Sequence, residues 1–251
     1  VRKASKATTV DMVTEIYINA LLSGLPTHAI NILSNASVVL NTVLERKIAG
    51  IFGNEIESGE AAAQMIGIVE GAKDGFRLAK HAMRTGESSD VMQKQDLQNQ
   101  TAISAKDLEL TGTSGKAADF LGNTIRLAGR ALLASDEFFK AIAYRMEINA
   151  LAYRTAMKEN LSEEDFVKRV AELTENPPSN IKMEADAIKR YQTFTNPLGE
   201  TGRKFQNLRN SDNPAIALTA RLIMPFVRTP VNVIKYSMAR TPLALLMPTV
   251  R

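Results

Sequence analysis

Three glycines recur every four residues inside an otherwise helical stretch, IGIVEGAKDGF at residues 66–76. Glycine in a helix interior costs about 1 kcal/mol relative to alanine, so another interaction must offset the loss. Residues four apart lie on one face of a helix, and a face without side chains lets a second backbone approach closely. The pattern therefore predicts a helix that crosses another helix at short distance.

Alanines extend these glycines in both directions. The resulting small-residue row consists of Ala63, Gly67, Gly71, Gly75 and Ala79. Its partner helix can belong to the same chain or to a second subunit, and a helix broken at Gly71 is a third interpretation. A second set of small residues, Ala118, Gly122 and Gly129, is one candidate partner. Charged residues beside the row argue against burial in lipid.

Helical periodicity dominates the chain, and alternating strand-like runs bounded by turn pairs are missing from the sequence. Helices are predicted over residues 10–22, 26–49, 58–84, 115–160, 163–174 and 180–193, with a polar connector over 87–115. The long helix is expected to begin at an N-cap, Ser114, and to bend near residues 134–135. Ser162 with Asp165 resembles a capping box. We predict an all-α protein, a multi-helix bundle with a proline-punctuated, extended C-terminal segment.

The pattern changes after residue 195, where prolines divide the chain into short helical pieces and extended links. We therefore predict a helical core over 1–195 and a basic, proline-punctuated helical tail over 196–251. From Glu200 to Arg251 there are eight basic and two acidic residues, a net charge of about +6 against +4 for the whole chain. This asymmetry suggests an anionic partner for the tail.

Four basic residues of the tail are candidate contacts for that partner. Arg221, Arg228 and Lys235 recur every seven residues, Arg240 follows, and apolar residues lie between them. Such a segment can lie on anionic lipid, contact phosphates or dock on a protein. It can equally bury its apolar side chains on its own domain, with the arginine stems reaching solvent.

No motif in the sequence predicts catalysis. The chain has no Cys, which excludes disulfides and thiolate metal ligands. Its two histidines, His28 and His81, lack a metal-ligand spacing, and LTGTSGKA at 110–117 lacks the glycine and hydroxyl residue of a phosphate-binding loop. The adjacent Asp136 and Glu137 are expected to diverge as surface charges on a helix. We predict no catalytic, cofactor-binding or metal-binding residue, and no enzyme activity.

The ends and the apolar runs of the chain complete this picture. No apolar run reaches the roughly 18–20 residues of a membrane-spanning helix, and no signal peptide is recognisable. The chain starts at Val1 and stops at Arg251 in mid-pattern, so we expect it to be an excerpt of a longer polypeptide.

Three stretches together resemble one family of phage proteins. They are LLSGLPTHAINILSNASVVL at 21–40, LLASDEFFKAIAYRMEINALAYRTA at 132–156 and IMPFVRTPVNVIKYSMARTPLALL at 223–246. They are similar to segments of the internal virion proteins, or DNA-ejection proteins, of short-tailed bacteriophages and of related large polyvalent phage proteins. The resemblance spans nearly the whole chain.

The resemblance implies a helical section of a larger structural protein, packed in the capsid near the portal. Such proteins form homo-oligomeric rings or tubes, contact other internal virion proteins, and pass into the host cell envelope to help form a conduit for the genome. Genomic DNA and envelope lipid are therefore further expected partners. The peptidoglycan-cleaving domain of some relatives has no counterpart in these residues.

Two other hypotheses compete with this one. The first is a nucleic-acid-binding or membrane-surface-binding helical module that acts through the basic tail. The second is a helical enzyme, which would need polar groups that converge in a cleft around Asp136, Glu137 or His81.

Overall fold

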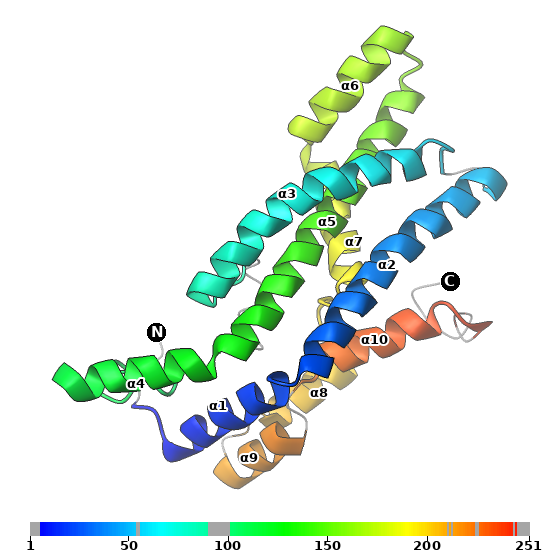
Figure 1. Cartoon of the computed structure of the whole chain (residues 1–251). Coiled ribbons are helices and arrows are strands. Elements are labelled where there is room, and N and C mark those ends of the chain that lie inside the picture. The colour runs from blue at the N-terminus through cyan, green and yellow to red at the C-terminus, as the bar shows by residue number, and fades with distance from the viewer. Residues whose placement is uncertain are drawn as a thin grey trace. The chain divides into compact units, whose positions relative to one another are not determined.

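The computed structural model describes residues 6–53, 56–89, 101–209, 211, 213–223, 226–242 and 244. Within these residues the chain forms ten helices and no strand (Figure 1), which confirms the all-α prediction. The bounds are α1 Thr9–Leu22, α2 Leu25–Phe52, α3 Glu60–Thr85, α4 Gly112–Ile125, α5 Leu127–Lys158, α6 Glu163–Glu175, α7 Ser179–Gln192, α8 Glu200–Arg209, α9 Pro214–Ile223 and α10 Arg228–Met238.

The helix ends differ from the predictions mainly around the long helix. Ser162 caps α6 as predicted, since its side chain accepts a hydrogen bond from the Asp165 N–H. The expected helix over 115–160 is instead two helices, which meet at Arg126, and residues 134–135, where a bend was expected, lie within the continuous helix α5. Ser114 is not an N-cap, because α4 begins at Gly112. Part of the predicted connector, residues 90–100, lies outside the described residues.

The chain divides into two compact units, each built from segments far apart in the sequence. Unit 1 holds Val1–His28, Met83–Leu133 and Pro197–Arg251, and unit 2 holds Ala29–Ala82 and Ala134–Asn196. The boundary expected at 195/196 lies next to Pro197, where the chain passes from unit 2 back into unit 1. The residues before this point contribute to both units. Helices α2, α3 and α5 each supply residues to both units, so no single cut in the sequence separates them.

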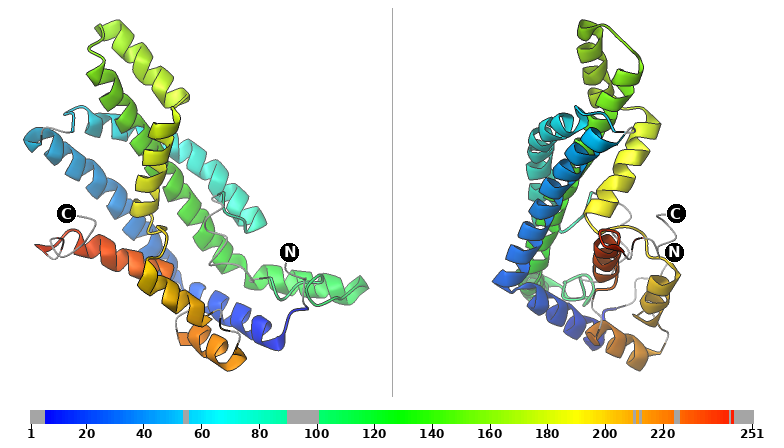
Figure 2. Two further views of the ribbon diagram at one scale, coloured as in Figure 1. Left: turned by 180° about the vertical axis from the view of Figure 1, so that it is seen from behind. Right: turned by 90° about the vertical axis from the view of Figure 1, so that its right-hand side faces the viewer.

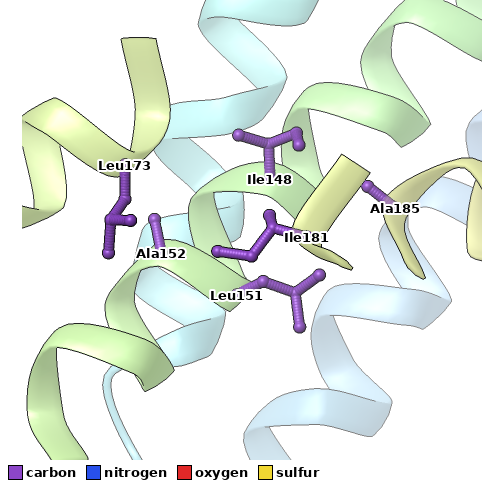
Figure 3. Close-up of a cluster of buried hydrophobic side chains, with 6 residues drawn as sticks. All are labelled: Ile148, Leu151, Ala152, Leu173, Ile181 and Ala185. Atoms are coloured by element: carbon purple, nitrogen blue, oxygen red, sulfur yellow. The ribbon is translucent and has the colours of Figure 1, made fainter. Parts of the chain in front are cut away.

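Helix α5 forms the centre of unit 2. Its residues from Ala141 to Ala143 and from Met146 to Ala152 are buried without interruption, so it has neighbours on every side. Helices α3 and α2 run beside it (Figure 1), and Val39 of α2 packs with Ile142 and Met146 in one core cluster. A second cluster joins α5 to α6 and α7 (Figure 3); its members are Ile148, Leu151, Ala152, Leu173, Ile181 and Ala185.

The small-residue row lies against the backbone of α5. A Cβ atom on Gly67 would lie 2.6 Å from the Arg145 carbonyl oxygen, and one on Gly71 would lie 2.6 Å from the Ile142 Cα. A Cβ on Gly75 would lie 2.8 Å from the Phe138 carbonyl oxygen. Such distances are shorter than Cβ atoms adopt, so glycine is what permits this helix crossing. Ala63 is buried and Ala79 is half-buried.

The partner of the row is therefore inside the same chain. On α5 the contacts recur at Phe138, Ile142 and Met146, also four residues apart. The second set of small residues is not the partner: Gly122 faces the Ile103 carbonyl oxygen, and Gly129 faces the side chain of Asn19. A role for the row between subunits is a separate matter and stays a prediction.

A buried carboxylate, Glu15, organises part of unit 1. It accepts hydrogen bonds from the Ile103 N–H at 2.8 Å and from the Arg126 guanidinium at 2.8 Å. Burial raises the pKa of Glu15, although both hydrogen bonds act in the opposite direction. Because Arg126 sits between α4 and α5, this ion pair ties the helix break to α1.

Helices α8, α9 and α10 belong to the same unit, and Figure 2 shows them from two further sides. Helix α9 packs against α1, where the Tyr17 hydroxyl donates a hydrogen bond of 2.9 Å to the Leu222 carbonyl oxygen. The predicted tail is thus folded into helices that contact the start of the chain.

We expect Gly71→Ala to lower the free energy of unfolding by about 1–3 kcal/mol, despite the higher helix propensity of alanine. The reason is that the new Cβ would meet a backbone atom of α5, which cannot rotate away. Urea unfolding measures the effect. Gly24→Ala is the control, because its Cβ would make only ordinary contacts from 3.4 Å. A Gly71→Ala protein as stable as wild type would contradict the packing role.

Candidate interaction surfaces

Helix α2 carries a row of exposed apolar side chains on its outer face. We call this row the α2 seam; it consists of Ile30, Leu33, Ser37, Leu40, Leu44, Ile48 and Ile51. Its six apolar members are between 56% and 65% exposed. The intervals between members are three or four residues and together span three heptads, which is the spacing of a seam that packs against another helix.

The opposite face of α2 already packs into the core of unit 2. Asn35, Val38, Val39 and Thr42 are the buried residues of this helix. They lie roughly half a turn away from the α2 seam, given 3.6 residues per turn. Helix α2 therefore has two apolar faces, and the described part of the chain covers one of them.

Charge is missing from most of this helix. Residues 16–44 contain no Asp, Glu, Lys or Arg, and Glu45 and Lys47 are the first exposed charges on α2. The outer face of a surface helix ordinarily carries charged and polar residues. A search for continuous apolar runs missed this stretch, since Ser, Asn and Thr interrupt it. Scanning for the longest charge-free segment would have found it.

Helix α3 also exposes large apolar side chains, but its outer face is charged. Met65, Ile66, Val69 and Phe76 are each more than half exposed. Lys73 and Lys80 lie exposed on the same helix. Phe76 is in addition part of the fold, since its ring lies 4.9 Å from that of Phe138, centroid to centroid. The α2 seam is thus the larger uncharged surface of unit 2.

Four charged side chains form a buried cluster between α2, α3 and α5. Arg46 donates to Glu60 at 2.7 Å and to both carboxylate oxygens of Glu147 at 2.8 Å. Arg154 donates twice to Glu60 at 2.7 Å. With two cations and two anions, each carboxylate is satisfied by a guanidinium, so the cluster holds three helices in register.

The pKa values of the two acids of this cluster shift in opposite directions. Burial raises the pKa of Glu147, and its pairing with Arg46 offsets this only in part. Burial also acts to raise the pKa of Glu60, but hydrogen bonds from Arg154, the Glu57 N–H and Arg46 outweigh it, so its pKa lies below the ordinary value. Glu60 is therefore held as a carboxylate that stabilises the fold.

The expectation that Asp136 and Glu137 are surface charges is wrong for Glu137. Its side chain is fully buried, and the buried Lys140 reaches it at 3.0 Å and Asp136 at 2.6 Å. The sequence did not show this burial, which follows from the central position of α5. The lysine bridges the two acids, so they form an ion-paired group. His81 lies exposed on α3 and His28 is half-buried on α2.

The four basic residues of the tail do not form one continuous face. Arg221 lies on α9, 3.6 Å from the Asp11 carboxylate, whereas Arg228 begins α10, so the seven-residue interval crosses a break between helices. Lys235 is exposed on α10. Arg240 lies over the Tyr236 ring, 3.5 Å from its centroid. Their role as contacts for an anionic partner stays a prediction.

The described part of the chain has two further properties, which concern membrane-spanning helices and metal-binding groups. No single helix there is both long and apolar enough to cross a membrane, although α1 and α2 taken together as a bent pair meet the requirement by length and composition. Among the same residues, no group of three or more His, Asp or Glu side chains is placed to hold a metal ion.

Comparison with known proteins yields no relative. No protein-family model matches the chain, and neither a curated protein nor a solved structure is significantly similar to it. The resemblance to phage internal virion proteins therefore stays a prediction from the three sequence stretches.

We expect Glu60→Gln to lower the free energy of unfolding by about 3–5 kcal/mol near neutral pH, because it leaves Arg46 and Arg154 short of a buried partner. The Glu60 pKa is lower in the folded state, so its contribution is present above the unfolded pKa and is lost as the pH falls through the folded pKa. The difference between wild type and variant should therefore shrink on acidification, as urea titrations from about pH 7 to about pH 3 would show.

Glu184→Gln is the matched control for this experiment. Its side chain is 53% exposed and lies 4.0 Å from Arg154. An exposed pair of this kind contributes about 0–1 kcal/mol. A Glu60→Gln effect as small as that of the control, or one that does not change with pH, would show that the cluster does not stabilise the fold in this way.

Proposed function

We propose that this chain is a structural segment that acts by packing against other molecules, with no catalytic role in its 251 residues. The α2 seam carries this proposal. Six large apolar side chains exposed along one face of a helix are unfavourable in water, since each fully buried Leu or Ile side chain gains about 1.5–3 kcal/mol. A surface of this size and regularity is typical of an interaction site.

The buried charges support a structural role as well. In the Arg46–Glu60–Glu147–Arg154 cluster every acid faces a guanidinium, and Lys140 bridges Asp136 and Glu137. A general acid or base needs a proton that it can exchange with substrate in a cleft. Glu60 and Glu147 are engaged in ion pairs between helices, and Asp136 and Glu137 in ion pairs within α5, so we assign all four acids a structural role.

We further propose that this chain belongs to an internal virion or DNA-ejection protein of a short-tailed bacteriophage. Its expected location is the capsid interior near the portal, with transfer to the host cell envelope on infection. Support comes from the three stretches of sequence resemblance, from the all-α fold and from the exposed α2 seam, which suits a subunit of an oligomer.

The first test is self-association of the purified chain. We expect sedimentation velocity to show a weight-average mass that rises with concentration, because burying the α2 seam is favourable. A second measurement follows the protein in phage particles by quantitative mass spectrometry. We expect it in mature particles and expect it to be depleted from particles that have ejected their DNA. A chain that stays monomeric at every concentration and is missing from mature particles would refute the proposal.

A second candidate function is binding of an anionic partner through α10. Lys235 is exposed there beside Ile234, which is 59% exposed, so a cation and an apolar side chain share one surface. This combination suits a nucleic-acid backbone or an anionic membrane surface.

We expect Lys235→Glu to weaken binding of duplex DNA by about 3-fold or more at low salt if α10 contacts phosphates, and to reduce the slope of log affinity against log salt by about 1. Fluorescence anisotropy over a salt series measures both quantities. Lys182→Glu on α7 is the control, since Lys182 is also an exposed helical lysine. Equal affinities and slopes for the two variants would count against DNA binding by α10.

A further inference from the structure

We infer that the α2 seam packs against the α2 seam of a second copy of this chain. The inference rests on the proposed function and names its partner: an identical helix, related by a two-fold axis. Such an interface requires a surface that is complementary to itself. Three properties of the seam, namely its neutrality, its narrowness and its area, point to this occupant.

Neutrality is the first property. Between Leu25 and Leu44 helix α2 has no Asp, Glu, Lys or Arg, and its one histidine, His28, lies outside the seam. A DNA backbone or an acidic protein would find no cation here to pair with. From Ile30 to Leu44 two copies of the seam can meet without placing like charges against each other, which would otherwise oppose self-pairing.

Narrowness is the second property. The seam follows a heptad spacing, so its width suits the ridge of one facing helix. Exposed polar residues, Ser34 and Asn41, follow one flank of it. Sinking this face into lipid would bury the Asn41 amide among acyl chains, where an unpaired amide costs several kcal/mol. Beside a second protein helix the same amide stays at a wet rim.

Area is the third property. A buried Leu or Ile side chain removes about 60–120 Å² of apolar surface from water. At the observed exposures the six apolar members and Phe52, which is 83% exposed, therefore supply roughly 250–550 Å² per copy. Homodimer interfaces are about 65% apolar, which implies roughly 800–1,600 Å² for the pair. The middle of this range equals the total area of about 1,200 Å² at which stable protein–protein interfaces begin.

Cysteine cross-linking tests the inference directly, because the natural chain has no Cys. Single-Cys variants Leu33→Cys, Leu40→Cys and Ile48→Cys place thiols along the seam, and Met183→Cys places one on α7 as a control, at 68% exposure. With a mild oxidant we expect covalent dimers for at least one seam variant and only the monomer for the control. Covalent dimers at all three seam positions would indicate a parallel pair, and dimers at one would indicate an antiparallel pair.

A charge substitution provides the second arm. We expect Leu40→Glu to shift the concentration of half-association at least 10-fold upward, because it places two carboxylates in the middle of the paired seams. Met183→Glu is the matched control, an exposed apolar residue replaced by the same acid, and should associate like wild type. Circular dichroism of each variant confirms that the helices are retained, as expected for side chains that are already exposed.

The outcomes separate this inference from the proposed function. An oligomer that persists in Leu40→Glu, together with no cross-link at any seam position, would overturn seam pairing and leave the structural role intact. Flotation with neutral phosphatidylcholine vesicles that is lost in Leu40→Glu, without seam cross-links, would also overturn it in favour of lipid. A chain that is monomeric and missing from particles would refute the proposed function itself.

Discussion

The close crossing of α3 and α5 is the contact on which unit 2 depends. At Gly67, Gly71 and Gly75 the two backbones approach so closely that a Cβ would overlap atoms of α5. Glycine raises the entropy lost on folding. The crossing is therefore stable only if the short distance between the two backbones lets the surrounding side chains pack more closely. The gain is visible in α5, which is buried almost without interruption from Ala141 to Ala152.

A central helix with no exposed side imposes a second constraint, because its charged residues have to be paired inside the protein. Glu137, Lys140 and Glu147 all lie on α5 and all are buried. Each is matched by an opposite charge within hydrogen-bonding distance. Breaking such a pair leaves an uncompensated buried charge. The Glu137–Lys140 pair lies within α5. The pairs that Arg46 forms with Glu60 and Glu147, and that Arg154 forms with Glu60, join α2, α3 and α5 and therefore enforce one register where purely apolar contacts would tolerate several.

That register also decides which face of α2 is left outside. Arg46 points inward to reach Glu60 and Glu147, and Val38, Val39 and Thr42 lie on the inward half of the helix. The seam from Ile30 to Ile51 is consequently held outward by the same ionic contacts that close the core. Its exposure is thus a product of the fold.

The sequence by itself determined the helical class, most helix positions and the existence of a tight crossing, because periodicity, caps and glycine spacing are local properties of a chain. It did not identify Phe138, Ile142 and Met146 as the other side of that crossing, since a partner helix there offers its backbone and needs no small residues. It also misplaced Glu137, because burial depends on neighbours from other helices. Above all, only the tertiary structure distinguished the two faces of α2. Burying an apolar side chain lowers the free energy by the same amount whether its own chain or another chain covers it. Composition alone therefore cannot distinguish a core from an interface.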